Sequence, residues 1–265
     1  MRLRGGRLLA RGTNGIRKIV AGLRPFNESV WPGVRNDLFV AHESIYDFFG
    51  CFADGRDVFD GGCGTGYGSA RLAAAGARSV LGVDLDPSSI RYARRHYASD
   101  RVTFQIGDLE CLSLADSSID LAVASNSLEH LDHPERFLES LARYLRPGGV
   151  AILAVPPIYT GADLATHASI HYHRSNLTVE EWLSRIRDAG FQVACYAHRA
   201  AANRNPDFSS PFRSRLQVTD FVFTPTNACE LRSTPSITAV FVAKRLGGKD
   251  VLVLERGTET TPDQP

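Results

Sequence analysis

Residues 58–68 read VFDGGCGTGYG and place five glycines directly between a short apolar run and a segment of small, helix-favouring residues. Because glycine has no Cβ, a strand–turn–helix of this kind lets the backbone approach a ligand closely. The dinucleotide pattern G-x-G-x-x-G is not met, since Tyr67 or Ser69 stands at its third position. No lysine follows the glycines, and Asp60 opens the loop with a carboxylate that repels phosphate. The stretch therefore predicts a site for a cationic, phosphate-free, nucleotide-like ligand.

The rest of the chain alternates short apolar runs with segments of helical period from residue 56 onward. This alternation is typical of βαβ units, which build a parallel sheet with helices on both faces. Strands are expected at about residues 58–59, 79–83, 102–106, 119–124, 150–155, 191–196 and 237–243. Helices are expected at about residues 69–75, 87–97, 134–145 and 178–189. The pattern thus predicts an α/β fold with a seven-stranded, mostly parallel sheet.

The glycine-rich stretch resembles the first motif of class I (Rossmann-like) S-adenosylmethionine-dependent methyltransferases, whose usual form is hydrophobic-D-x-G-C-G-x-G. The resemblance extends over about residues 57–243, since Asp84 closes the second expected strand and Asp108 follows the third. It implies the class I methyltransferase fold, S-adenosylmethionine as cofactor, and relatives that act on small molecules or glycans.

Roles for single residues in cofactor binding follow from that resemblance. Asp84 would accept hydrogen bonds from both ribose hydroxyls, because a carboxylate accepts two at once. Asp108 and Leu109 would recognise the adenine edge, and Gly61 to Gly64 would border the methionine part. The predicted cofactor-binding set is Asp60, Gly61, Gly62, Gly64, Asp84, Leu85, Asp108, Leu109 and Asn126.

Candidate catalytic residues follow the fourth and fifth expected strands, at the sheet edge where open α/β folds bind their ligands. The segment Glu129-His130-Leu131 is similar to the E-H-L/V segment of many class I small-molecule methyltransferases. His130 and Glu129 are therefore candidates for a base or an orienting group. A helix-entry turn held by hydrogen bonds is the alternative. His173 lies five residues before Thr178, as a histidine does in similar sugar and glycan methyltransferases, and is the second candidate base.

A metal site is the less favoured interpretation of the same residues. Two related families, the ubiquinone-pathway O-methyltransferases and the small-RNA 2′-O-methyltransferases, carry E-x-x-E-H as a divalent-metal site. In this chain Asn126 replaces the first glutamate, and an amide oxygen is a weaker ligand for a hard cation. Asn126, Glu129, His130 and His173 would hold a metal only with reduced charge, so we expect no metal.

The domain organisation is predicted from composition along the chain. Residues 1–50 are expected to form a basic N-terminal arm and a helical extension, since the first 24 residues carry seven Lys or Arg. Residues 51–246 are expected to form the S-adenosylmethionine-binding domain. A cap-like insertion is expected at 199–236, before the last strand, because that segment is polar and shows little periodicity. Residues 247–265 are expected to be a C-terminal tail.

Composition also limits the partners and the setting. The formal net charge is +1, so no overall field recruits nucleic acid or an acidic membrane surface. The apolar runs are far short of a bilayer span, and the five cysteines form no C-x-x-C pair. We expect a cytoplasmic protein, without membrane insertion or a nucleic-acid partner. The expected reaction is methyl transfer to a small-molecule or sugar oxygen; an RNA 2′-O-methyltransferase and a catalytically silent S-adenosylmethionine-binding module are the alternatives.

Overall fold

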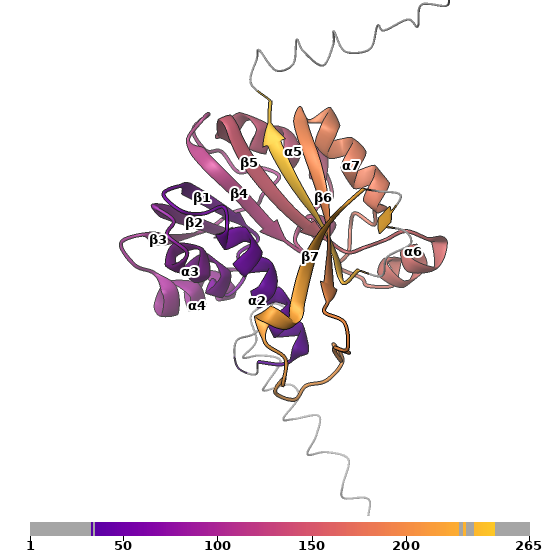
Figure 1. The fold of residues 1–265 in the computed structure, drawn as a ribbon. Coiled ribbons are helices and arrows are strands. Elements are labelled where there is room, and N and C mark those ends of the chain that lie inside the picture. Colours follow the sequence, from indigo (N-terminus) through magenta and orange to yellow (C-terminus); the bar gives the residue numbers. More distant parts are fainter. Residues whose placement is uncertain (1–32, 34, 228–229, 232–235, 247–265) are drawn as a thin grey trace, which may run out of the picture.

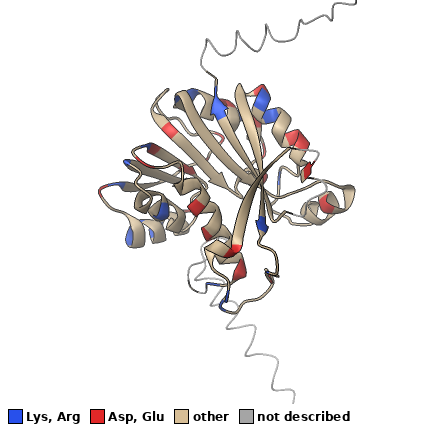
Figure 2. Cartoon of the chain, in the orientation of Figure 1, with Lys and Arg blue, Asp and Glu red and all other residues tan. Residues whose placement is uncertain are grey.

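The computed structural model describes residues 33, 35–227, 230–231 and 236–246 (Figure 1). The predicted basic arm up to residue 32 and the predicted tail at 247–265 lie outside these residues. Charged side chains of both signs are interspersed over the described elements (Figure 2), in keeping with the near-zero net charge. The described cysteines, Cys51, Cys63, Cys111 and Cys195, are free thiols.

The apolar runs form one sheet of eight strands. They are β1 (Asp57–Gly61), β2 (Ser79–Asp84), β3 (Val102–Ile106), β4 (Ile119–Ser125), β5 (Leu145–Val155), β6 (Phe191–Ala200), β7 (Phe221–Thr226) and β8 (Thr238–Arg245). Their order in the sheet is β3-β2-β1-β4-β5-β8-β6-β7. Neighbours among β1 to β5 are parallel, whereas β8 is antiparallel to both β5 and β6. The predicted mostly parallel α/β sheet is confirmed.

The sheet has eight strands where seven were expected. The additional strand is β7, which lies within the segment 199–236 that was expected to be a cap-like insertion. Strand β6 extends to Ala200, and β7 pairs with it in antiparallel register from Cys195↔Thr226 to Ala200↔Phe221. Pro225 lies inside β7 and cannot donate a ladder hydrogen bond, which is tolerated because β7 is the edge strand. A proline in an apolar run also argues against a strand, so the sequence pattern does not predict β7.

Helices cover both faces of the sheet (Figure 1). They are α2 (Asp37–Gly50), α3 (Tyr67–Ala74), α4 (Pro87–Tyr97), α5 (Pro134–Tyr144), α6 (Gly161–Ala168) and α7 (Val179–Asp188), with a 3₁₀ turn η1 at Leu128–His130. One apolar cluster contains residues of α2, α3 and α4, and the other contains residues of α5 and α7. Successive side chains of β1 point to opposite faces of the sheet, so Val58 belongs to the first cluster and Phe59 to the second. Among the described helices, none has both the length and the apolarity needed to cross a bilayer.

Local capping explains where several helices begin. The side chain of Asp86 accepts hydrogen bonds from the backbone N–H groups of Ser88 and Ser89, which starts α4 as predicted. Thr178 and Glu181 form the predicted capping box of α7. Helix α6 begins with a second capping box and buries none of its residues. It was not predicted, because a short exposed helix shows no apolar stripe.

Candidate active site

The glycine-rich loop connects β1 to α3 and lies against the ends of two neighbouring strands. The backbone N–H groups of Gly62 and Cys63 donate to the carbonyl of Val83, at 2.8 and 3.0 Å. Gly62 has a φ of +73°, and a Cβ there would lie 2.2 Å from the hydroxyl of Ser127, which follows β4. The backbone therefore runs where only glycine fits, with its N–H and C=O groups close to any ligand at this edge.

Asp60, at the end of β1, is wholly buried beneath the loop. Its two carboxylate oxygens accept hydrogen bonds from Tyr46 Oη at 3.1 Å and from Ser69 Oγ at 2.6 Å. Burial raises the pKa of Asp60 to about 7, against the lowering effect of these two hydrogen bonds. Asp60 thus joins β1, α2 and α3 from inside the protein, and it presents no surface to a ligand.

Asp84, at the end of β2, is the acidic residue that does face this edge. Its Oδ2 accepts the N–H of Gly64 and its Oδ1 accepts the N–H of Asp86, both at 2.8 Å. Burial raises the pKa of Asp84, and the two N–H groups oppose that rise. Each carboxylate oxygen has a second lone pair, so the group is held in place and still able to accept ligand hydroxyls.

The ends of β2 and β3 expose apolar side chains beside these acids. Leu85 is 66% exposed and Ile106 is 45% exposed, although both are large aliphatic residues. Asp108 is exposed and accepts the N–H of Glu110 at 2.9 Å, whereas Leu109 is buried. A flat, apolar ligand group would cover Leu85 and Ile106. Sequence analysis did not single out Ile106, because nothing in a strand pattern marks its exposure.

The turn after β4 completes the edge. Asn126 has a φ of +46° and donates its N–H to the carbonyl of Ala154 at 2.9 Å. Asparagine is among the residues that tolerate this left-handed conformation. The turn then continues into η1, which carries Leu128 inward and brings Glu129 and His130 to the edge of the sheet.

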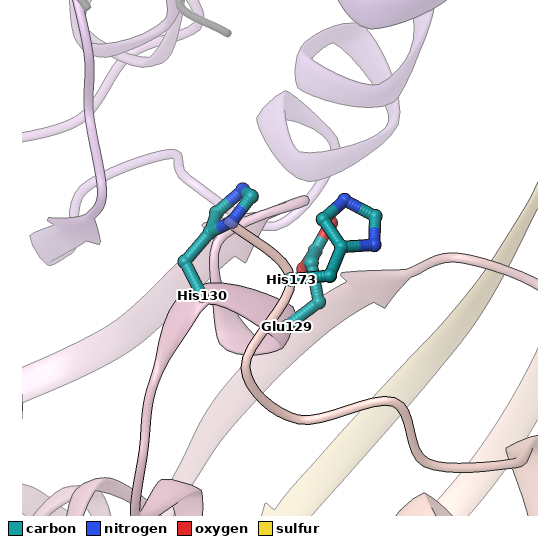
Figure 3. A group of neighbouring side chains, drawn as sticks. All are labelled: Glu129, His130 and His173. Carbon is teal, nitrogen blue, oxygen red and sulfur yellow. The ribbon is translucent and has the colours of Figure 1, made fainter. Parts of the chain in front are cut away.

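The three predicted catalytic side chains lie together (Figure 3). Glu129 and His130 come from η1 and His173 from the loop before α7, and one ligand-type atom of each lies within 4.8 Å of the others. Glu129 is 3% exposed, and both histidines are half-buried. The structure thus brings together residues that are 43 or 44 positions apart in the chain.

Hydrogen bonds of the backbone fix the cluster. The carbonyl of Glu129 accepts the N–H groups of Arg174 and Ser175, at 2.7 and 3.0 Å, and Ser175 Oγ donates to the carbonyl of Leu131 at 2.7 Å. His130 Nδ1 lies 3.2 Å from the carbonyl oxygen of Tyr172. These contacts dock the loop on η1. The turn at 128–130 therefore has a structural role as well, which was the alternative interpretation of this segment.

The electrostatics of the cluster favour a neutral His173. Burial, together with the neighbouring His130 and His167, lowers the pKa of His173 to about 4. His167, on α6, stacks on His173 at an interplanar angle of 13°, and their Nδ1 atoms are 3.4 Å apart. His130 is also close enough to Asp84 to lower the pKa of that carboxyl, which opposes the larger effect of burial. The cluster therefore adjoins the Asp84 end of the site.

The strand order, the glycine loop and the acids at the strand ends together define a class I methyltransferase fold. Residues 59–153 match the family described as "Methyltransferase domain". A solved structure of an S-adenosylmethionine-dependent methyltransferase from Thermotoga maritima superposes with a TM-score of 0.60, over 89% of this chain and 96% of that one. At 18% identity, this likeness bears on the fold alone.

Sequence relatives agree with the fold. A "probable S-adenosylmethionine-dependent methyltransferase" of Mycolicibacterium smegmatis is 35% identical over 168 residues, which cover 63% of this chain and 64% of the relative. A malonyl-[acyl-carrier protein] O-methyltransferase of Pectobacterium atrosepticum is 41% identical over 100 residues, 38% of each protein. The chain thus spans less than two thirds of these relatives' lengths. Residues 59–153 thus match a methyltransferase domain, and the predicted resemblance to S-adenosylmethionine-dependent methyltransferases, with that cofactor as methyl donor, agrees with these relatives.

Proposed function

We propose that this protein binds S-adenosylmethionine at the carboxyl ends of β1 to β4 and transfers its methyl group to an oxygen atom of a small-molecule or sugar acceptor. The observation that carries the proposal is the placement of Asp84, whose carboxylate is fixed by two backbone N–H groups at the end of β2. A fixed carboxylate with free lone pairs suits the two neighbouring hydroxyls of a ribose.

Each neighbouring residue takes one part of the cofactor in this proposal. Asp84 accepts the ribose hydroxyls, and Leu85 and Ile106 cover the adenine faces with exposed apolar surface. Asp108 lies where it can accept from the adenine amino group. Gly61 to Gly64 border the methionine part, where a Cβ at Gly62 would collide with Ser127, and Asn126 faces the same part from the turn after β4.

Asp60 acts from beneath the loop. It is wholly buried, and Tyr46 and Ser69 occupy its two oxygens. We assign it to holding β1 and α3 in register so that the loop keeps its shape. This assignment changes its expected role from direct contact with the cofactor to support of the residues that make the contact.

The acceptor lies against Glu129, His130 and His173. S-adenosylmethionine supplies a methyl group on a sulfonium, and displacement at that carbon needs an aligned nucleophile more than covalent help from the protein. A hydroxyl must lose its proton as it attacks, which gives the cluster its task. The name of the O-methyltransferase relative supports oxygen as the acceptor atom.

The test uses the purified full chain and methyl-labelled S-adenosylmethionine. We expect label to enter hydroxyl- or carboxyl-bearing small molecules or sugars, with one S-adenosylhomocysteine released for each methyl transferred. Label entering only RNA oligonucleotides would replace the acceptor class with RNA. Tight binding of S-adenosylhomocysteine with no turnover across sugars, phenols, carboxylic acids, acyl thioesters and RNA would favour the silent binding module.

A further inference from the structure

The Glu129, His130 and His173 cluster has the composition and placement of a three-ligand metal site. Two imidazoles and one carboxylate converge with their ligand-type atoms within 4.8 Å of one another. In a tetrahedral site with bonds of about 2.1 Å, two ligand atoms lie about 3.4 Å apart, so a bound ion would draw the most distant pair together by up to about 1.4 Å. We propose that Glu129, His130 and His173 bind one divalent transition-metal ion.

The hydrogen bond of His130 supports a ligand role. A carbonyl oxygen only accepts, so the contact of His130 Nδ1 with the carbonyl of Tyr172 at 3.2 Å places a proton on Nδ1. Nε2 is then the unprotonated ring nitrogen, the one able to ligate an ion. Metal-binding histidines usually donate their other ring N–H to a carbonyl or carboxylate in this manner.

The backbone makes the cluster a fixed site rather than a chance meeting of side chains. Two N–H groups, those of Arg174 and Ser175, donate to the carbonyl of Glu129, and Ser175 Oγ ties the loop to Leu131. The loop that carries His173 is therefore docked on the turn that carries the other two ligands. Ligands held in this way lose little conformational freedom when an ion binds.

Charge and chemistry select the kind of ion. The cluster combines one carboxylate with two imidazoles. Imidazole ligands favour zinc, cobalt or iron over magnesium and calcium, which prefer oxygen ligands. His167 contacts His173 through Nδ1 at 3.4 Å, and we assign it a positioning role.

Three protein ligands leave at least one coordination position for an acceptor oxygen, the arrangement of catalytic rather than structural sites. The use of the ion in catalysis rests on the proposed methyl transfer, whereas its binding does not. An acceptor hydroxyl bound to the ion would release its proton to water. Its oxygen would then form the bond to the methyl carbon as the bond from that carbon to sulfur breaks, leaving neutral S-adenosylhomocysteine.

This inference revises the expectation that the site holds no metal. That expectation depended on Asn126 as a weak fourth ligand. In the structure, Glu129, His130 and His173 already supply three ligand-type atoms that converge.

Metal binding is tested on the full chain after removal of metals with a chelator. Titration with Co²⁺ is followed by visible absorption and titration with Zn²⁺ and Mn²⁺ by calorimetry, with Mg²⁺ as the comparison ion. We expect one Co²⁺ or Zn²⁺ per chain. Glu129→Gln, His130→Ala and His173→Ala should each weaken binding by more than about 100-fold, and His167→Ala by about 10- to 100-fold.

His171→Ala is the matched control, because this exposed histidine lies in the same loop and outside the cluster. It should leave metal affinity unchanged. The proposal is overturned if the parent chain binds none of the three transition metals, or if stoichiometric binding survives all three ligand substitutions. Affinity for S-adenosylhomocysteine, measured in parallel, separates this result from failure of the proposed function: a chain that binds S-adenosylhomocysteine but none of the three metals keeps the cofactor site and loses the metal site.

Discussion

The carboxylate of Asp84 accepts the backbone N–H of Gly64 at 2.8 Å, and this bond connects the end of β2 to the middle of the glycine-rich loop. The residue proposed to hold the ribose therefore also fixes the loop proposed to border the methionine part. A second N–H, that of Asp86, holds the other oxygen at the same distance. The two halves of the cofactor site are thus positioned by one side chain.

The first prediction concerns that side chain. Asp84→Ala should weaken S-adenosylhomocysteine binding by about 1.5–3 kcal/mol, the usual worth of hydrogen bonds to a charged group. Calorimetric titration of the folded variant measures the loss. Asp86→Ala is the control, since it removes the cap of α4 and costs about 1 kcal/mol of stability but keeps the backbone N–H that Asp84 accepts. Equal cofactor affinity in Asp84→Ala and the parent chain would refute the ribose assignment.

The second prediction concerns the close approach of the loop to β4. Gly62→Ala should destabilise the fold by more than the roughly 1–2 kcal/mol of a left-handed φ alone, because the new Cβ meets Ser127 Oγ at 2.2 Å. Gly148→Ala supplies the comparison, since Gly148 has a φ of +78° and open space around its Cβ position. Adding Ser127→Gly should recover the excess cost of Gly62→Ala in urea denaturation. An excess that persists in the double variant would contradict the steric explanation.

The third prediction concerns a buried histidine near the carboxyl end of β6. Ser44 Oγ donates to the carbonyl of Ala41, so His198 Nε2–H donates to Ser44 Oγ, at 3.0 Å. His198 Nδ1 is buried with no hydrogen-bond partner among the described residues, and burial lowers the pKa of His198 to about 3. In the unfolded chain the pKa of this histidine is near 6.5, so on acidification the unfolded chain binds a proton at a higher pH than the folded chain does. Between pH 6.5 and 3, His198 should therefore lower the free energy of unfolding by about 1.4 kcal/mol for each unit that the pH falls.

Asp60 should act in the opposite direction over nearly the same range. Its folded pKa of about 7 exceeds the unfolded value of 3.8, so the folded chain holds a proton that the unfolded chain lacks. Stability from Asp60 is then present below pH 3.8 and is lost as the pH rises toward 7. Denaturation at several pH values should show that Asp60→Asn steepens the loss of stability in acid and that His198→Gln reduces it. Parallel pH profiles for both variants and the parent would show that neither group titrates as described.

Much of the fold was predictable because its signals are local. The capping residues Asp86 and Thr178 mark the starts of α4 and α7 by hydrogen bonds within three residues. Strand β7 does not stand out in the sequence, because its pairing with β6 is a tertiary contact and Pro225 lowers its strand propensity. The burial of Asp60 likewise depends on Tyr46, which α2 brings from outside the motif.

The candidate site was predictable in its members but not in its geometry. Glu129 and His130 were identified by resemblance to a motif, and His173 by its spacing from Thr178. Spacing does not say that the loop before α7 docks on η1, which follows from backbone hydrogen bonds to Glu129. For the same reason, the sequence weighs the metal interpretation on Asn126 and does not show that the other three side chains converge.

The last prediction concerns the contribution of the cluster to methyl transfer. His130→Ala and His173→Ala should each slow turnover by roughly 10²- to 10⁴-fold at saturating S-adenosylmethionine, the usual worth of a positioned group that assists proton loss. Affinity for S-adenosylhomocysteine should be preserved, because the cluster is proposed to face the acceptor and Asp84 is proposed to hold the cofactor. The loss should be largest with aliphatic hydroxyls and smaller with phenols or carboxylic acids, whose lower pKa makes them nucleophiles with less help. Single-turnover rates across such an acceptor series measure this dependence. A uniform loss across the series would assign the two histidines to positioning the acceptor, and unchanged turnover in both variants would exclude them from the reaction.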